Sequence, residues 1–151
     1  MRLSSFIKKG LLLAFSGLAI SPVLSAQEVT FHKDIEPILQ RSCQTCHRDG
    51  GVAPMPLVSY DETAPFAGLI EYKTSLRDRA GAMPPFYAEK NIGIQHIKDD
   101  PSLSDAELAA ISTWARSGAP KGDAADAPAP LVFDNNAKWK LGEPDKIVQL
   151  K

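Results

Sequence analysis

The chain has 151 residues, a formal net charge of −1 and only two cysteines. A chain of this length accommodates one small domain with extensions. The near-neutral charge excludes the strongly basic surface that is typical of nucleic-acid-binding proteins. Small molecules or other proteins are therefore the partners that the composition leaves open.

Residues 1–26 have the pattern of a secretory signal peptide. Arg2, Lys8 and Lys9 precede the apolar run GLLLAFSGLAI, and small residues at positions 25 and 26 form a cleavage site. The run is too short to span a bilayer comfortably. We predict a periplasmic or secreted protein of about 125 residues, whose formal charge becomes −4 because the three basic residues are removed. Membrane association would require that this segment remain uncleaved.

The first predicted helix of the mature chain leads into the two cysteines. In DIEPILQRSCQTCH, Ile35, Ile38 and Leu39 recur at helical spacing. Proline is tolerated in the first turn of a helix but not deep inside it, so Pro37 places the start of this helix between residues 34 and 36. The residues just before it are expected to be extended.

Cys43, Cys46 and His47 form a C-x-x-C-H motif. A free thiol pair is rare in an oxidising compartment. A thioredoxin-like redox pair would need a strand before the motif, and a structural zinc site would need four ligands. A Cys43–Cys46 disulfide would close only a very small loop and would leave the adjacent histidine unexplained.

The same motif is the attachment pattern of haem c, and this interpretation accounts for all three residues. Positions i and i+3 of a helical turn project to the same side. The sulfurs of Cys43 and Cys46 can therefore form thioethers with the two vinyl groups at one edge of the porphyrin. His47 then reaches the iron as the proximal ligand. We predict one covalently bound haem c at this motif.

A second helical region follows the loop RDGGVAPMP. Ser59 and Glu62 form a capping box, which predicts a short helical turn after Ser59. Pro65 is expected to open the next helix. The residues expected in register along that helix are Phe66, Leu69, Ile70, Lys73 and Leu76.

The clearest helical pattern lies in SLSDAELAAISTWARSGAP. Ser104 and Glu107 form a second capping box, and Gly118 followed by Pro120 predicts the end of the helix. The predicted apolar stripe consists of Leu108, Ile111, Trp114 and Ala115.

The chain divides into four predicted segments, of which residues 1–26 are the signal peptide. Residues 27–120 are expected to form the haem domain, 121–130 a mobile Pro/Ala/Asp linker, and 131–151 a tail that could begin a truncated second domain. Strand signals are weak throughout residues 27–118. A domain of about 90 residues with few large apolar side chains has a thin core, so a covalent haem would supply much of its interior.

Three stretches resemble a class I c-type cytochrome: FHKDIEPILQRSCQTCH, AGAMPPF and LSDAELAAISTWARSGAP. The resemblance covers about residues 29–120. It implies an all-α cytochrome c fold of three to four helices around one haem, with an irregular C-terminal tail. It also implies that a methionine from a loop binds the face of the iron opposite the proximal histidine.

The longer string CHRDGGVAPMPLVSYDE, with a later MPP, resembles a bacterial branch of that family. In this branch the cytochrome domain often precedes a domain similar to copper-dependent ascorbate-type monooxygenases. WKLGEPDKIVQL resembles the first stretch of such a second domain. The resemblance therefore implies either an electron carrier or the domain through which electrons reach a larger oxidoreductase.

Met83 is the expected distal ligand of the iron. It lies in a proline-rich loop 36 residues after His47, whereas Met55 lies only eight residues after it and is expected to pack in the interior. His96 is the alternative that would give bis-His ligation. The resemblance also implies that a proline carbonyl accepts a hydrogen bond from the proximal histidine, and Pro56 is the best-placed candidate.

Pro54 is the second choice for that carbonyl, and His32 is expected to be exposed. With both axial positions of the iron occupied, no substrate reaches the metal. We therefore expect no catalytic residues and a function in single-electron transfer, with a redox protein as a transient partner. The alternative from a different class is a haem-based ligand sensor with a labile sixth position.

Overall fold

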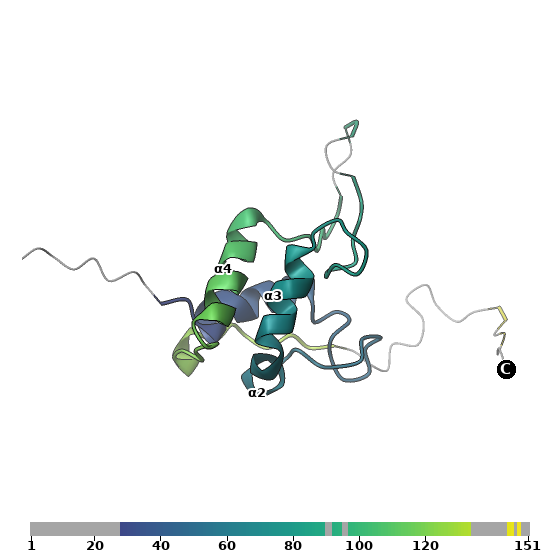
Figure 1. Ribbon diagram of the computed structural model, residues 1–151. Coiled ribbons are helices and arrows are strands. Elements are labelled where there is room, and N and C mark those ends of the chain that lie inside the picture. The colour runs from purple at the N-terminus through teal and green to yellow at the C-terminus, as the bar shows by residue number, and fades with distance from the viewer. Residues whose placement is uncertain (1–27, 90–91, 95–96, 134–144, 147, 149–151) are drawn as a thin grey trace, which may run out of the picture.

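The computed structural model describes residues 28–89, 92–94, 97–133, 145–146 and 148, and Figure 1 shows its arrangement. The predicted signal peptide at 1–26, His96 and most of the 131–151 tail lie outside these residues. No β-strand occurs in the described part, which confirms an all-α fold. None of its helices has the length and apolar character that a membrane span requires. Its elements are η1 (Phe31–Ile35), α1 (Glu36–Ser42), α2 (Tyr60–Thr63), η2 (Ala64–Phe66), α3 (Ala67–Ser75), α4 (Asp105–Arg116) and η3 (Ala124–Asp126).

The first helix begins earlier than the sequence pattern predicts, because a π-helical turn, η1, precedes α1. Asp34 stabilises this turn, since its Oδ2 accepts a hydrogen bond from the Thr30 N–H at 2.7 Å. Pro37 lies in the first turn of α1, as predicted. The buried side chains of the two elements include Phe31, Ile35 and Leu39, which are fully buried. The apolar spacing in the sequence thus identifies the core side of the helix.

The Ser59–Glu62 capping box is present at α2. The Ser59 N–H donates to Glu62 Oε2 at 2.8 Å, and the Glu62 N–H donates to Ser59 Oγ. The hydrogen bond from the Ser59 backbone also lowers the pKa of the Glu62 carboxyl. α3 then buries Ile70 and Thr74, whereas Leu69 stays 44% exposed. The predicted helix is confirmed, but Leu69 does not lie on its core side.

α4 packs against α3 and carries the second capping box. The Ser104 N–H donates to Glu107 Oε2 at 2.8 Å, and Ser104 Oγ accepts from the Glu107 N–H. At the other end Gly118 has a φ of 88°. The Ala119 N–H donates to Trp114 O and the Gly118 N–H to Ala115 O, which is the Schellman arrangement. The predicted start and end of this helix are therefore both confirmed.

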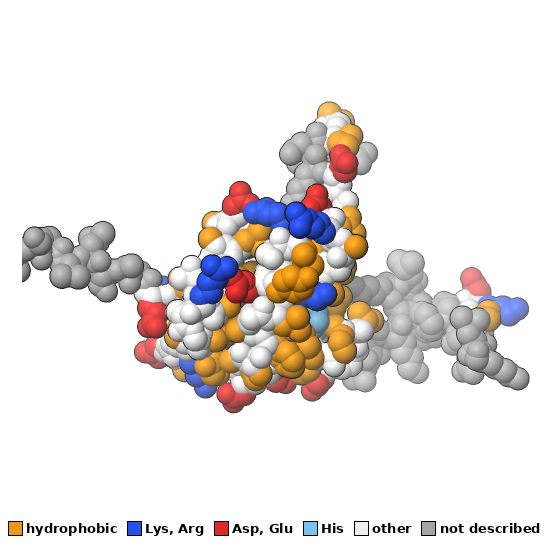
Figure 2. Space-filling view, in the orientation of Figure 1, with side chains coloured by type: hydrophobic (Ala, Val, Ile, Leu, Met, Phe, Trp, Pro, Cys, Tyr) orange, Lys and Arg blue, Asp and Glu red, His pale blue; other side chains and the backbone are white. Residues whose placement is uncertain are grey.

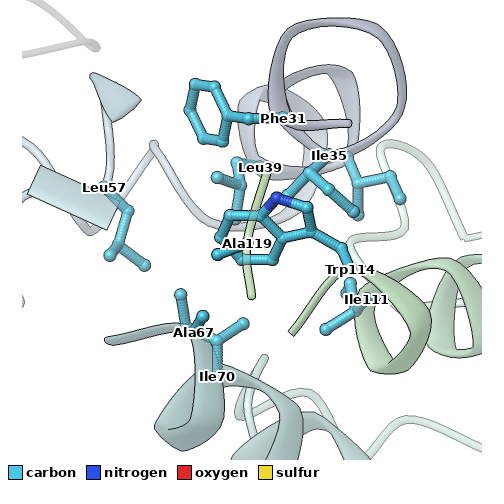
Figure 3. Packing of buried hydrophobic residues seen from close by; sticks show 10 residues of the cluster. Phe31, Ile35, Leu39, Leu57, Ala67, Ile70, Ile111, Trp114 and Ala119 are labelled. Atoms are coloured by element: carbon cyan, nitrogen blue, oxygen red, sulfur yellow. The ribbon is translucent and has the colours of Figure 1, made fainter. Parts of the chain in front are cut away.

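Trp114 lies at the centre of the hydrophobic core, as Figure 3 shows. Its side chain is fully buried, and its ring centroid is 6.0 Å from that of Phe31. The Pro120 carbonyl accepts two hydrogen bonds, from the Phe31 N–H at 2.9 Å and from Trp114 Nε1 at 3.1 Å. Tyr60 Oη donates to the Ala119 carbonyl at 2.9 Å. These bonds join the first helical turn, α2 and the end of α4 around one buried ring.

Residues 121–133, which we call the C-terminal strap, run back across the molecule after α4 (Figure 1, yellow-green). The His32 N–H donates to the Lys121 carbonyl at 3.2 Å, and Gln40 Nε2 donates to the Ala129 carbonyl at 3.0 Å. The Arg48 guanidinium lies over the Phe133 ring. Contacts with the domain thus continue beyond residue 120, where the sequence composition places the start of a free linker.

Candidate functional site

Cys43, Cys46 and His47 lie on one tight turn directly after α1. The Cys46 N–H and the His47 N–H both donate to the Cys43 carbonyl, at 3.1 and 2.9 Å. Both thiols are free, and Cys43 is half-buried against the core whereas Cys46 is exposed. The end of the helix thus places two free thiols and an imidazole within five consecutive residues.

The turn continues into a compact loop, and we call residues 43–57 the attachment loop. The Ala53 N–H donates to the Cys46 carbonyl at 3.1 Å, and the Leu57 N–H donates to the His47 carbonyl at 3.0 Å. A Cβ added at Gly51 would lie 2.2 Å from the Cys46 carbonyl oxygen, so only glycine fits there. Backbone hydrogen bonds within the loop therefore hold its second half against Cys46 and His47.

Gln44, inside the motif, anchors this loop to the interior. Its side chain is 1% exposed, and its Nε2 donates to the Leu57 carbonyl at 3.0 Å. The bond joins the start of the attachment loop to its end. A buried amide with a partner of this kind restricts the loop to one conformation, since leaving the amide unpaired would cost free energy.

His47 is held by a backbone carbonyl, but the carbonyl belongs to Met55. His47 Nδ1 is 2.9 Å from Met55 O. The prediction that the carbonyl of Pro56, or of Pro54, accepts this hydrogen bond is therefore wrong. The hydrogen bond from Leu57 to the His47 carbonyl reverses the chain so that the carbonyl of Met55 faces the ring.

The bond to Met55 determines which nitrogen of His47 is available. A carbonyl can only accept, so Nδ1 must carry the proton and Nε2 keeps its lone pair in the neutral ring. His47 Nε2 has no hydrogen bond to the residues that the structure describes. An imidazole oriented through its other nitrogen is the usual arrangement of a histidine that ligates a metal.

The two methionines lie in different environments. The Met55 side chain is half-buried and packs against the core, as predicted. Met83 is 39% exposed, and its N–H donates to the Lys73 carbonyl at the end of α3, at 3.1 Å. Met83 is thus the more exposed of the two residues, and the backbone of its loop is hydrogen-bonded to α3.

Met83 lines a cavity of about 500 Å³ between the end of α3 and the start of α4. Leu103, Leu108 and Phe86 contribute apolar side chains to it, and Thr74 a buried hydroxyl. Cys43, Cys46 and His47 do not line this cavity. Arg77, Asp78 and Glu89 also line the cavity, so its surface is mixed in polarity. The structure therefore places Met83 at this cavity but does not bring it together with His47.

Burial raises the pKa of the Cys43 thiol to about 12, even though the nearby positive charge of Arg41 lowers it. The thiol is therefore protonated near neutral pH, and a protonated thiol is a poor nucleophile. Arg41 itself connects α1 to the loop before α4. Its guanidinium donates to the Asp100 and Ser102 carbonyls and to Glu107 Oε1, the last at 2.7 Å.

No three His, Cys, Asp or Glu side chains in the described part of the chain are grouped so that they could hold one metal ion. Cys43, Cys46 and His47 are adjacent in sequence, yet they do not converge on one point. A structural zinc site needs such convergence. A haem needs two sulfurs at the porphyrin edge and a nitrogen under the iron instead.

His32 is not exposed, contrary to the expectation from the sequence. The His32 side chain is 13% exposed, and its Nδ1 is 2.8 Å from Glu36 Oε2. The spacing of four residues between His32 and Glu36 was the signal that could have predicted this pair. His96, the predicted alternative ligand for bis-His ligation, lies outside the described residues.

The arrangement can present two thiols and one oriented imidazole to a planar cofactor, and Met83 lies on a second loop. The sequence motif does not identify the Met55 carbonyl as the partner of His47, because every residue has a backbone carbonyl and the residue type does not mark it. No family model, curated protein or solved structure matches this chain.

Proposed function

We propose that this protein is a monohaem c-type cytochrome that transfers single electrons outside the cytoplasm. The observation that carries the proposal is the turn after α1, where two free thiols precede a histidine whose Nδ1 is held by Met55 O at 2.9 Å. That hydrogen bond leaves Nε2 free for a metal. The proposed location follows from the signal-peptide pattern at residues 1–26.

The residues present fit a covalent haem. Cys43 and Cys46 would hold it through thioethers, His47 would bind one side of the iron, and Met83 the other. When bound, the haem supplies one-electron exchange between Fe(III) and Fe(II), and ligation by His and Met raises its potential. The chain contributes orientation of the imidazole through Met55 O and a closed loop around the attachment turn.

Exposed apolar side chains on α3 offer surface that an apolar cofactor could cover. Leu69 and Tyr72 are 44% and 58% exposed and lie three residues apart on α3, so they share one side of that helix. Figure 2 shows hydrophobic side chains gathered over α3 and the loops beside it. A haem would remove such surface from water, which is favourable in proportion to the area buried. The small cytochrome c fold is our proposal for this all-α domain.

We expect a transient interface with a redox protein partner and no substrate site on this domain. A carrier whose two axial positions are both filled offers no open coordination position to a substrate. Weak electron-transfer complexes bury less than about 1,200 Å² in total. The proposal therefore requires only a small contact area around an exposed haem edge.

The test is a redox titration of the full chain, followed by addition of carbon monoxide to the reduced protein. We expect reversible one-electron behaviour and no change in the reduced spectrum with carbon monoxide, because Met83 fills the sixth position. Rapid carbon monoxide binding would instead identify a sensor with a labile sixth position. The absence of any reversible one-electron step would contradict electron transfer altogether.

A further inference from the structure

The C-terminal strap reaches the attachment loop through a series of contacts along its length. Its first residue, Lys121, accepts a hydrogen bond from the His32 N–H, and its Nζ lies 5.2 Å from the centroid of the Tyr60 ring. Further along, the Ala129 carbonyl accepts from Gln40 Nε2 at 3.0 Å. The strap therefore follows η1 and α1 towards the cysteine turn.

The strap ends on the residue that follows the proposed proximal ligand. Arg48 Cζ lies 4.4 Å from the centroid of the Phe133 ring, which is a cation–π distance. Phe133 is half-buried, whereas its neighbour Val132 is 96% exposed. Adjacent side chains of the strap thus point in opposite directions, and the aromatic one faces the attachment loop.

Both the backbone and the side chain of Arg48 have partners. Its carbonyl accepts a hydrogen bond from the Gly51 N–H at 2.9 Å, within the attachment loop. Its guanidinium is covered by the Phe133 ring and donates from Nη1 to the Asp49 carbonyl. Arg48 follows His47 directly in the chain. A positive charge that is partly shielded from water interacts with a nearby charge more strongly than a solvated one does.

We propose that the strap contributes to the function of the haem domain: Phe133 covers the Arg48 guanidinium, one residue after His47, and this keeps the reduction potential high. This inference rests on the proposed function. Fe(III) carries one more positive charge than Fe(II), so a nearby guanidinium and a lower local dielectric both disfavour the oxidised state. Detaching Phe133 should therefore lower the potential.

The test compares Phe133→Ala with Val132→Ala in the haem-bearing full chain. Two quantities are measured: hydrogen exchange of the backbone amides between residues 127 and 133, and the midpoint potential of the haem. In Phe133→Ala we expect about two- to fivefold faster exchange, the factor that one exposed cation–π contact represents. The potential should shift downwards. Val132→Ala should change neither quantity, because its side chain is already exposed.

Gln40→Ala provides a second variant at a distance from the iron. It removes the hydrogen bond to Ala129 and leaves Phe133 and Arg48 unchanged, so faster exchange and a smaller downward shift are expected. A haem-bearing protein whose potential stays constant in Phe133→Ala overturns the inference alone. Exchange in the unmutated strap as fast as in an unstructured peptide overturns it as well. A protein without haem overturns the proposed function too, although its exchange rates still show whether the strap is docked.

Discussion

Trp114→Ala is expected to lower the free energy of unfolding by about 3–5 kcal/mol, the usual cost of removing a large aromatic side chain from a core. Trp114 is fully buried and packs against Phe31 on the first helical turn. Its Nε1 also donates to the Pro120 carbonyl at 3.1 Å. Removing the ring therefore leaves a cavity at the junction of the first and last helices. Urea unfolding followed by circular dichroism measures the change.

Trp114→Phe separates the two contributions of this side chain. It keeps an aromatic ring in the core but loses the indole N–H. The Pro120 carbonyl retains its hydrogen bond from the Phe31 N–H, so the polar loss should cost only about 0.5–1.5 kcal/mol, in addition to a smaller packing loss. If Trp114→Ala were no more destabilising than Trp114→Phe, the ring would not be the centre of the core.

In the proposed haem protein, Met83→Ala is expected to have the largest effect on the iron. The oxidised protein should lose the weak near-infrared sulfur-to-iron band, and the reduced protein should begin to bind carbon monoxide. The potential should fall, because a thioether stabilises Fe(II) better than water or a nitrogen ligand does. Met83 is 39% exposed and its backbone is attached to Lys73, so the substitution should leave the fold intact.

Met55→Ala is the matched control, since it removes the same side-chain type within the same protein. The Met55 carbonyl that orients His47 belongs to the backbone and is retained. The near-infrared band should therefore remain, and only packing should be lost, at a cost of about 2 kcal/mol because the side chain is half-buried. The reverse pattern would assign the iron to Met55. The band could instead be absent from the unmutated protein and from both methionine variants. Loss of iron ligation in His96→Ala would then indicate bis-His ligation.

Features of the fold that depend on neighbouring residues could be predicted from the sequence. Both capping boxes and the glycine at the end of α4 are present, because each involves hydrogen bonds between residues at most five positions apart. The core side of the first helix also followed from its apolar spacing. The cysteine turn belongs to the same class, since Cys43 and His47 are joined by a local backbone bond.

Features that depend on distant contacts could not be predicted in the same way. The strap is rich in Ala, Pro and Asp and therefore resembles a free linker, yet Gln40 and Arg48 hold it from elsewhere in the chain. The acceptor for His47 was displaced by one residue, from Pro56 to Met55, because the turn geometry rather than the residue type decides which carbonyl faces the ring. Leu69 was expected in register with Ile70 on the helix, but only the structure shows that Ile70 is buried and Leu69 is exposed.

Covalent haem attachment, on which the proposed function depends, can be tested by the mass of the exported protein. The full chain is produced with export and c-type cytochrome maturation, then extracted with acid–acetone and weighed intact. We expect the mass of the polypeptide plus one haem. The colour should stay with the protein and should be lost when Cys43→Ala and Cys46→Ala are combined. A mass equal to the bare polypeptide, the loss of two hydrogens that a Cys43–Cys46 disulfide would give, or colour that extracts freely would contradict covalent attachment.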